Sequence, residues 1–243
     1  MKRSTTNIAI IFLLTAATIV FEISLSRLFS YLLSFHFVLI IIAFSILGLG
    51  IGQITYAKYS EKIDHSLLWW MALPSISMFL SFTLLLGLSQ IGVSSSSGFS
   101  LPVFILLSTI PFIAIGIVYA HIFETDKRHV STLYALDLIG AATGALASVF
   151  LLNAFGLVQV VAIAIGLLLL ALIIALIAGK NRFSKILVPL VLGVIFLMGF
   201  AKDGLDFDIP VAKDPSKDLY RLMANPAFKS EKLESRWSAF GKT

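Results

Sequence analysis

The sequence predicts an all-α fold: a polytopic helical membrane protein with about seven transmembrane helices and a short polar C-terminal tail. Of its 243 residues, 58% are hydrophobic and only 13% are charged, whereas a soluble domain carries about 25% charged residues. Apolar runs follow one another along most of the chain. Each is close to the roughly 20 residues that a helix needs to cross a hydrocarbon core about 30 Å thick. The chain is therefore expected to cross a bilayer several times.

The predicted transmembrane helical domain covers residues 1–201. Its expected spans, in chain order, are 7–33, 36–57, 66–91, 101–123, 131–153, 157–179 and 185–201. The first begins behind a basic N-terminus but runs past the length of a signal-peptide core, which favours a retained signal anchor. The third begins beside Trp69 and Trp70, which fit an interfacial aromatic belt. The seventh is short and contains proline and glycine, so it either crosses with a tilt or inserts only partly.

The loops between these spans carry charge on one side only. The connections after spans one, three and five contain no lysine or arginine. The positive-inside rule places the N-terminus and the basic loops in the cytoplasm, and seven spans then leave the C-terminal tail outside the cytoplasmic (inner) membrane. The basic residues on the cytoplasmic side are Lys2, Arg3, Lys58, Lys62, Lys127, Arg128, Lys180, Arg182 and Lys185.

The composition changes abruptly at Lys202. Residues 202–243 hold eight Lys or Arg and seven Asp or Glu, together with proline. A segment this short and polar will hardly form a core alone. We therefore expect a polar linker or tail and the start of a truncated soluble domain.

Three isolated charges interrupt the apolar spans: Glu22, Arg27 and Asp137. A carboxylate at the centre of a membrane helix costs about 2.5–3.5 kcal/mol on insertion scales, so it usually faces the bundle interior and a partner. Glu22 lies roughly 22 Å along the first span and is the stronger candidate for a functional acid. Asp137 lies about 9 Å past Ser131, so a structural contact and a proton or cation site are equally open for it. Counting depth in this way separates the two acids by about 12 Å.

Arg27 follows Glu22 at i+5, about 140° round the helix. An ion pair between these two side chains within the helix is therefore not expected. We expect Arg27 either to extend to the membrane surface or to pair with another helix.

Small residues on two spans predict close helix packing. Gly140 and Gly144 share a face of span five with Asp137, and Gly48 and Gly52 are four apart on span two. In lipid, small residues at this spacing let two backbones approach. A phosphate-binding loop is disfavoured on span two, because the run lies inside an apolar span and lacks the preceding strand and the lysine that such loops need.

Other chemistries find little support in the sequence. The chain has no cysteine, and its histidines (His36, His65, His121 and His129) show no i, i+4 pair or cluster. No Ser-His-Asp arrangement and no stripe of basic and aromatic residues can be argued from the spacing. We expect no catalytic, cofactor-binding or metal site in this chain and no nucleic-acid partner, and the oligomeric state stays open.

Three stretches together carry a family resemblance: "FEISLSRLFSYLLSFHFVLIIIAFSILGLGIGQ", "LYALDLIGAATGALASVFLLNAFGL" and "SKDLYRLMANPAFKSEKLESRWSAFGKT". They resemble the membrane-embedded spermidine-synthase-like proteins of bacteria. In that family a multi-helix N-terminal domain precedes a soluble domain similar to aminopropyltransferases, which has the nucleotide-binding fold of S-adenosylmethionine-dependent enzymes. The residues that match its membrane motifs are Glu22, Arg27, Gly48, Gly52, Tyr134, Asp137, Gly140 and Gly144.

The resemblance implies that this chain anchors, and feeds, a transferase-like domain that it does not contain. The segment "ESRWSAFGKT" looks like the part just before the first strands of the soluble domain. No transferase activity is therefore expected of the chain itself, and an S-adenosylmethionine-type donor is implied only for the missing domain. The implied partners are the lipid bilayer, that C-terminal domain, and a polyamine or other cation with Glu22 and Asp137 as its partners.

Two alternatives come from other classes of protein. One is a small transporter or channel for a cation or amine, in which Glu22, Arg27 and Asp137 line a path. The other is a pure membrane anchor or assembly module. A path needs the two acids to face a wet cavity, whereas an anchor needs only satisfied partners. A tail outside the cell is at odds with a cytoplasmic aminopropyl donor, unless span 185–201 does not cross.

Overall fold

A computed structural model describes residues 3–32, 38–65, 67–90, 100–178, 237–238 and 241–242. Within these ranges, six helices are long and apolar enough to cross a membrane. A short 3₁₀ turn, η2 (Lys127–His129), joins the fourth to the fifth, and β1 (Trp237–Ser238) pairs antiparallel with β2 (Gly241–Lys242). The helices are α1 (Arg3–Leu32), α2 (Val38–His65), α3 (Leu67–Gln90), α4 (Ser100–Thr125), α5 (Val130–Phe155) and α6 (Leu157–Ala178).

The predicted fold class is confirmed: the chain is a multi-pass helical membrane protein. The six helices correspond to the first six predicted spans. The largest difference is the end of α2, predicted at residue 57 and observed at His65. A kink at Tyr59 (φ −125°, ψ 23°) lets a charged segment continue the helix beyond the apolar part. The predicted seventh span, 185–201, and nearly all of the tail, 202–243, lie outside the described residues.

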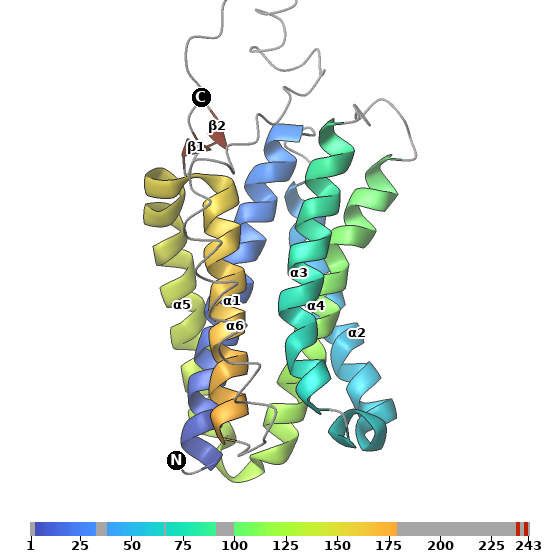
Figure 1. The fold of residues 1–243 in the computed structure, drawn as a ribbon, viewed down its shortest axis with the longest axis vertical. Coiled ribbons are helices and arrows are strands. Elements are labelled where there is room, and N and C mark those ends of the chain that lie inside the picture. The colour runs from blue at the N-terminus through green and yellow to red at the C-terminus, as the bar shows by residue number, and fades with distance from the viewer. Residues whose placement is uncertain are drawn as a thin grey trace, which may run out of the picture.

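The six helices form two three-helix units that lie side by side (Figure 1). In one unit α1 packs along α5 and α6, and in the other α4 packs along α2 and α3. The units meet where α1 faces α2 and α4, and where α3 faces α6. The N-terminus lies at one end of the bundle, and the β1–β2 hairpin lies at the other, beside α1 and α5.

The core lies along α1, whose buried side chains include Leu25 and Leu28. Aromatic contacts join this helix to α4 across the boundary between the units. The ring centroids of Phe21 and Phe112 are 5.9 Å apart, and those of Phe29 and Phe104 are 5.8 Å apart in an edge-on arrangement. Such pairs add about 0.5–1.5 kcal/mol beyond the area they bury.

The outer faces of α2 and α5 are strongly apolar and exposed. They carry Leu39, Ile46 and Ile54 on α2, and Leu146 and Phe150 on α5. In a membrane these faces meet lipid tails, which are as apolar as the side chains themselves. The serine and threonine hydroxyls inside the helices mostly donate to carbonyl oxygens three or four residues back, which satisfies them without water.

The glycines of span two bring α2 against α4. A Cβ added to Gly48 would lie 2.9 Å from the Cβ of Phe112. A Cβ added to Gly52 would overlap the carbonyl oxygen of Ile113 and lie 2.9 Å from the Cα of Gly116. The two backbones are therefore nearly in contact at Gly52 and Gly116.

The glycines of span five bring α5 against α1. A Cβ on Gly140 would lie 2.8 Å from the carbonyl oxygen of Phe12, and one on Gly144 would lie 2.7 Å from that of Ala16. Ser148 continues this face and is fully buried. Each unit is thus built round one glycine-lined helix pair.

Candidate functional site

Asp137 lies where α5, α1 and α4 meet. Its Oδ1 atom accepts hydrogen bonds from the Thr15 hydroxyl at 2.6 Å and from the Tyr119 hydroxyl at 2.9 Å. The Thr15 and Tyr119 hydroxyls are also within hydrogen-bonding distance of each other. One carboxylate oxygen therefore joins the two helical units, because Thr15 belongs to α1 and Tyr119 to α4.

The local sequence explains how Asp137 reaches these partners. Gly140, one turn further along α5, lies against Phe12 and Thr15, so the two helices approach closely enough for the carboxylate to contact α1. The Tyr119 ring is stacked on that of Phe123, with a centroid distance of 6.4 Å. This stacking fixes the direction from which the phenol hydroxyl approaches.

The partner residue Thr15 gives a second measure of where Asp137 lies along the bundle axis. Thr15 is ten residues into the α1 span that starts at Thr5, about 15 Å along the axis. The prediction of about 9 Å counted from Ser131 along α5 alone.

Glu22 makes a separate contact with α2. Its side chain is half-buried and lies beside Ser45, whose hydroxyl donates to the Ile42 carbonyl oxygen at 2.8 Å. Thr15 and Glu22 are seven residues apart on α1, about 10 Å along the axis. The two intramembrane acids therefore have different partners and do not form one site.

Arg27 belongs to neither contact. Its Nε atom is buried and has no hydrogen-bond partner among the described residues. Within the same residues no ion pair joins it to Glu22, in keeping with the i+5 spacing. Tyr134, which the resemblance also singled out, is exposed on α5.

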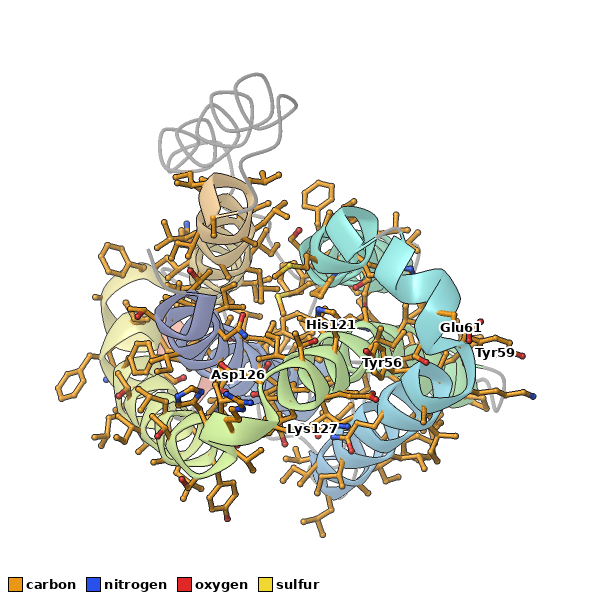
Figure 2. The ribbon with its side chains drawn as sticks, turned by 90° about the horizontal axis from the view of Figure 1, so that it is seen from below. Tyr56, Tyr59, Glu61, His121, Asp126 and Lys127 are labelled. Carbon is orange, nitrogen blue, oxygen red and sulfur yellow. The ribbon has the colours of Figure 1, made fainter. Side chains whose placement is uncertain are left out.

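A polar cavity of about 480 Å³ opens at the end of the bundle that holds the N-terminus. Figure 2 looks along the helices from this end and shows Tyr56, Asp126 and Lys127, which line the cavity, beside His121. Sequence reasoning did not find it. Its lining residues are Tyr56, Ser60, Glu124, Thr125, Asp126, Lys127 and Arg128.

His121 is buried beside this cavity. Its Nδ1 atom lies 3.3 Å from the Tyr56 hydroxyl, and the two rings meet edge-on with a centroid distance of 5.7 Å. The sequence marked His121 only as an isolated polar side chain. No pattern in the sequence indicated this contact, because it depends on the packing of α2 against α4 at Gly52 and Gly116.

Asp126 follows the end of α4 and contacts both His129 and helix α1. Its carboxylate lies 2.7 Å from His129 Nδ1 and accepts a hydrogen bond from the Asn7 amide on α1 at 3.4 Å. Asn7, Thr15 and Glu22 follow one face of α1, because spacings of eight and fifteen residues return to within about 80° of the starting direction. A row of polar contacts therefore runs from α1 to the other unit.

In the part of the chain that the structure describes, no three acidic, histidine or cysteine side chains converge to hold a metal ion. In comparisons with protein-family models, curated proteins and solved structures, nothing matches this chain. The contacts described above are therefore the basis for assigning a function to this chain.

Proposed function

We propose that this chain is the membrane domain of a spermidine-synthase-like protein and that it anchors a soluble transferase-like domain. One observation carries the anchoring role: the Asp137 carboxylate accepts hydrogen bonds from hydroxyl groups of two neighbouring helices. Thr15 and Tyr119 donate to Asp137, and Glu22 lies beside Ser45 of α2. Acids placed in this way stabilise the contact between the two helical units.

The position of the cavity also supports anchoring. Neither Glu22 nor Asp137 lines it. A carboxylate that conducts cations must exchange protein partners for water or for the cation, which is costly where two hydroxyls already occupy one of its oxygens. Satisfied acids between helices fit a rigid support better than a path.

The proposed topology keeps the N-terminus and the basic loops in the cytoplasm and the tail outside the inner membrane. The β1–β2 hairpin lies at the end of the bundle opposite the N-terminus, which supports this arrangement. The attached domain would then work on the outer face. This makes ordinary cytoplasmic spermidine synthesis the less suitable reaction for it.

A second candidate is a path for a cation or amine between the two units. The row of polar groups Asn7, Thr15 and Glu22 along one face of α1 favours it. In that case the hydroxyl contacts of Asp137 and Glu22 would open during transport, and both acids would contact the cation.

Uptake of labelled putrescine and spermidine into liposomes that contain the full chain separates the two candidates. Anchoring predicts uptake equal to that of empty liposomes for the natural chain, Glu22→Gln and Asp137→Asn alike. Glu61→Gln is the matched control, because Glu61 is an exposed acid at the end of α2 outside both contacts. Uptake by the natural chain that Glu22→Gln abolishes and Glu61→Gln leaves unchanged would establish the path instead.

A further inference from the structure

The walls of the end cavity carry charges of both signs in equal number. Glu124 and Asp126 contribute two carboxylates, of which Asp126 also contacts His129 and Asn7, and Lys127 and Arg128 contribute two cations. A site for a simple anion would be weakened by the carboxylates, and a site for a simple cation by the basic groups. The lining is therefore matched to a ligand that carries both charges.

Hydroxyl groups complete the lining and one of them is fixed in place. Tyr56 is only 3% exposed, yet it lines the cavity, and its hydroxyl lies beside His121 Nδ1. Thr125 and Ser60 add two further hydroxyls. Such groups both donate to phosphate oxygens and accept from ammonium groups.

The two basic groups of the lining are exposed to solvent and can contact a ligand. Arg128 is exposed and makes no ion pair or hydrogen bond with the residues that the structure describes. Lys127 pairs with Glu124 at 3.8 Å, but both side chains are more than half exposed, and such surface pairs are weak. A ligand with opposite charges can replace this pair with shorter contacts.

The cavity lies at the depth where lipid headgroups are found. The apolar span of α2 ends at Glu61, next to the lining residue Ser60, and that of α4 ends at Thr125, which lines the cavity. Trp70 packs against the buried cluster of Tyr56 and Ile117 next to it. Tryptophan and tyrosine are enriched at the membrane–water interface, where the ring lies in apolar surroundings and the polar atom faces water.

We propose that this cavity binds the headgroup of a phospholipid that carries a primary ammonium group, of the phosphatidylethanolamine type. Arg128 and Lys127 hold the phosphate, and Glu124 and Asp126 accept the N–H groups of the ammonium. A quaternary ammonium has no N–H group to donate to the carboxylates. A headgroup without a cation offers the carboxylates no group of opposite charge. This inference does not depend on the proposed function.

Binding of single lipids to the full purified chain, measured by native mass spectrometry after delipidation, tests this inference. We expect phosphatidylethanolamine to bind between about threefold and tenfold more tightly than phosphatidylcholine or phosphatidylglycerol, a range set by charge-assisted hydrogen bonds at a partly exposed site. Arg128→Gln should weaken binding of all three lipids. Glu124→Gln should reduce the preference for phosphatidylethanolamine and strengthen binding of phosphatidylglycerol, because it removes one of the two carboxylates that repel an anion.

Lys58→Gln is the matched control for charge at this end of the bundle. Lys58 lies over the Tyr59 ring on the same end of α2 and does not line the cavity, so its loss should leave the preference intact. Equal binding of the three lipids by the natural chain, or equal effects of Arg128→Gln and Lys58→Gln, would overturn the proposal. So would binding of glycerophosphoethanolamine, which lacks acyl chains, as tightly as the lipid, because the ligand would then be a soluble zwitterion.

Discussion

Replacement of Gly52 by alanine is expected to lower the free energy of unfolding by about 3 kcal/mol, at the upper end of the usual cost of overpacking. The new methyl group would overlap the Ile113 carbonyl oxygen and crowd the Cα of Gly116. Both obstacles belong to the backbone of α4, so no side-chain rotation relieves them. The two helices must separate, and the contacts along the α2–α4 pair weaken with them. Unfolding by sodium dodecyl sulfate in mixed micelles, followed by circular dichroism, measures this loss.

Gly50→Ala provides the matched control two residues away. A Cβ at Gly50 would meet nothing within 4 Å, and alanine has a better helix propensity than glycine by up to about 1 kcal/mol. This variant should therefore be as stable as the natural chain or slightly more stable. If Gly50→Ala and Gly52→Ala unfold alike, the close contact between α2 and α4 is wrong.

Asp137→Leu is expected to lower the free energy of unfolding by about 2 kcal/mol. The substitution removes the charged acceptor of two hydroxyl groups, so the Tyr119 phenol keeps only the Thr15 hydroxyl as a partner at the boundary between the units. Thr15 is less affected, since its hydroxyl can still donate to the Ile11 carbonyl oxygen at 2.9 Å. Asp137→Asn keeps an acceptor oxygen in place and should cost less than about 1 kcal/mol.

A double-mutant cycle shows whether the loss passes through Tyr119. Asp137→Leu and Tyr119→Phe remove opposite ends of one hydrogen bond, so their effects should not add, with a coupling of about 0.6–1.7 kcal/mol. Unfolding in the same mixed micelles supplies the four values. Strict additivity, or equal stabilities for Asp137→Leu and Asp137→Asn, would contradict the contact.

The helices and their packing faces could be predicted from the sequence because lipid imposes simple rules on it. A span needs a minimum apolar length, and close contact needs small side chains at regular spacing. Gly48, Gly52, Gly140 and Gly144 follow the second rule, and the structure places each against a neighbouring helix. The sequence could not identify that neighbour, since α1 pairs with α5 and α2 with α4, and neither pair is consecutive.

The partners of the two acids could not be predicted from the sequence for the same reason. Thr15, Ser45 and Tyr119 are ordinary residues in apolar spans, and only the arrangement of helices gives them a role. The spacing of polar residues along α1 did indicate which face of this helix makes polar contacts. Asn7, Thr15 and Glu22 return to one face of the helix, which marks the boundary between the units.

The end cavity was missed because its residues come from two separate parts of the sequence. Tyr56 and Ser60 belong to the end of α2, and the remaining lining residues run from Glu124 to Arg128. In the sequence the first group looks like the end of a span and the second like a basic loop. The contact between α2 and α4 at Gly52 is what brings them together.

The central claim, that the intramembrane acids serve packing rather than a path, is tested most directly by single cysteine substitutions. The chain contains no cysteine, so each new thiol is the only one in the protein. Glu22→Cys, Asp137→Cys and Glu124→Cys in membrane vesicles can be treated with a charged, water-soluble thiol reagent. Our account predicts rapid labelling at position 124, which is exposed, and none at positions 22 and 137. Labelling at 22 and 137 at rates near that of 124 would contradict it and would show a water-filled path between the two helical units.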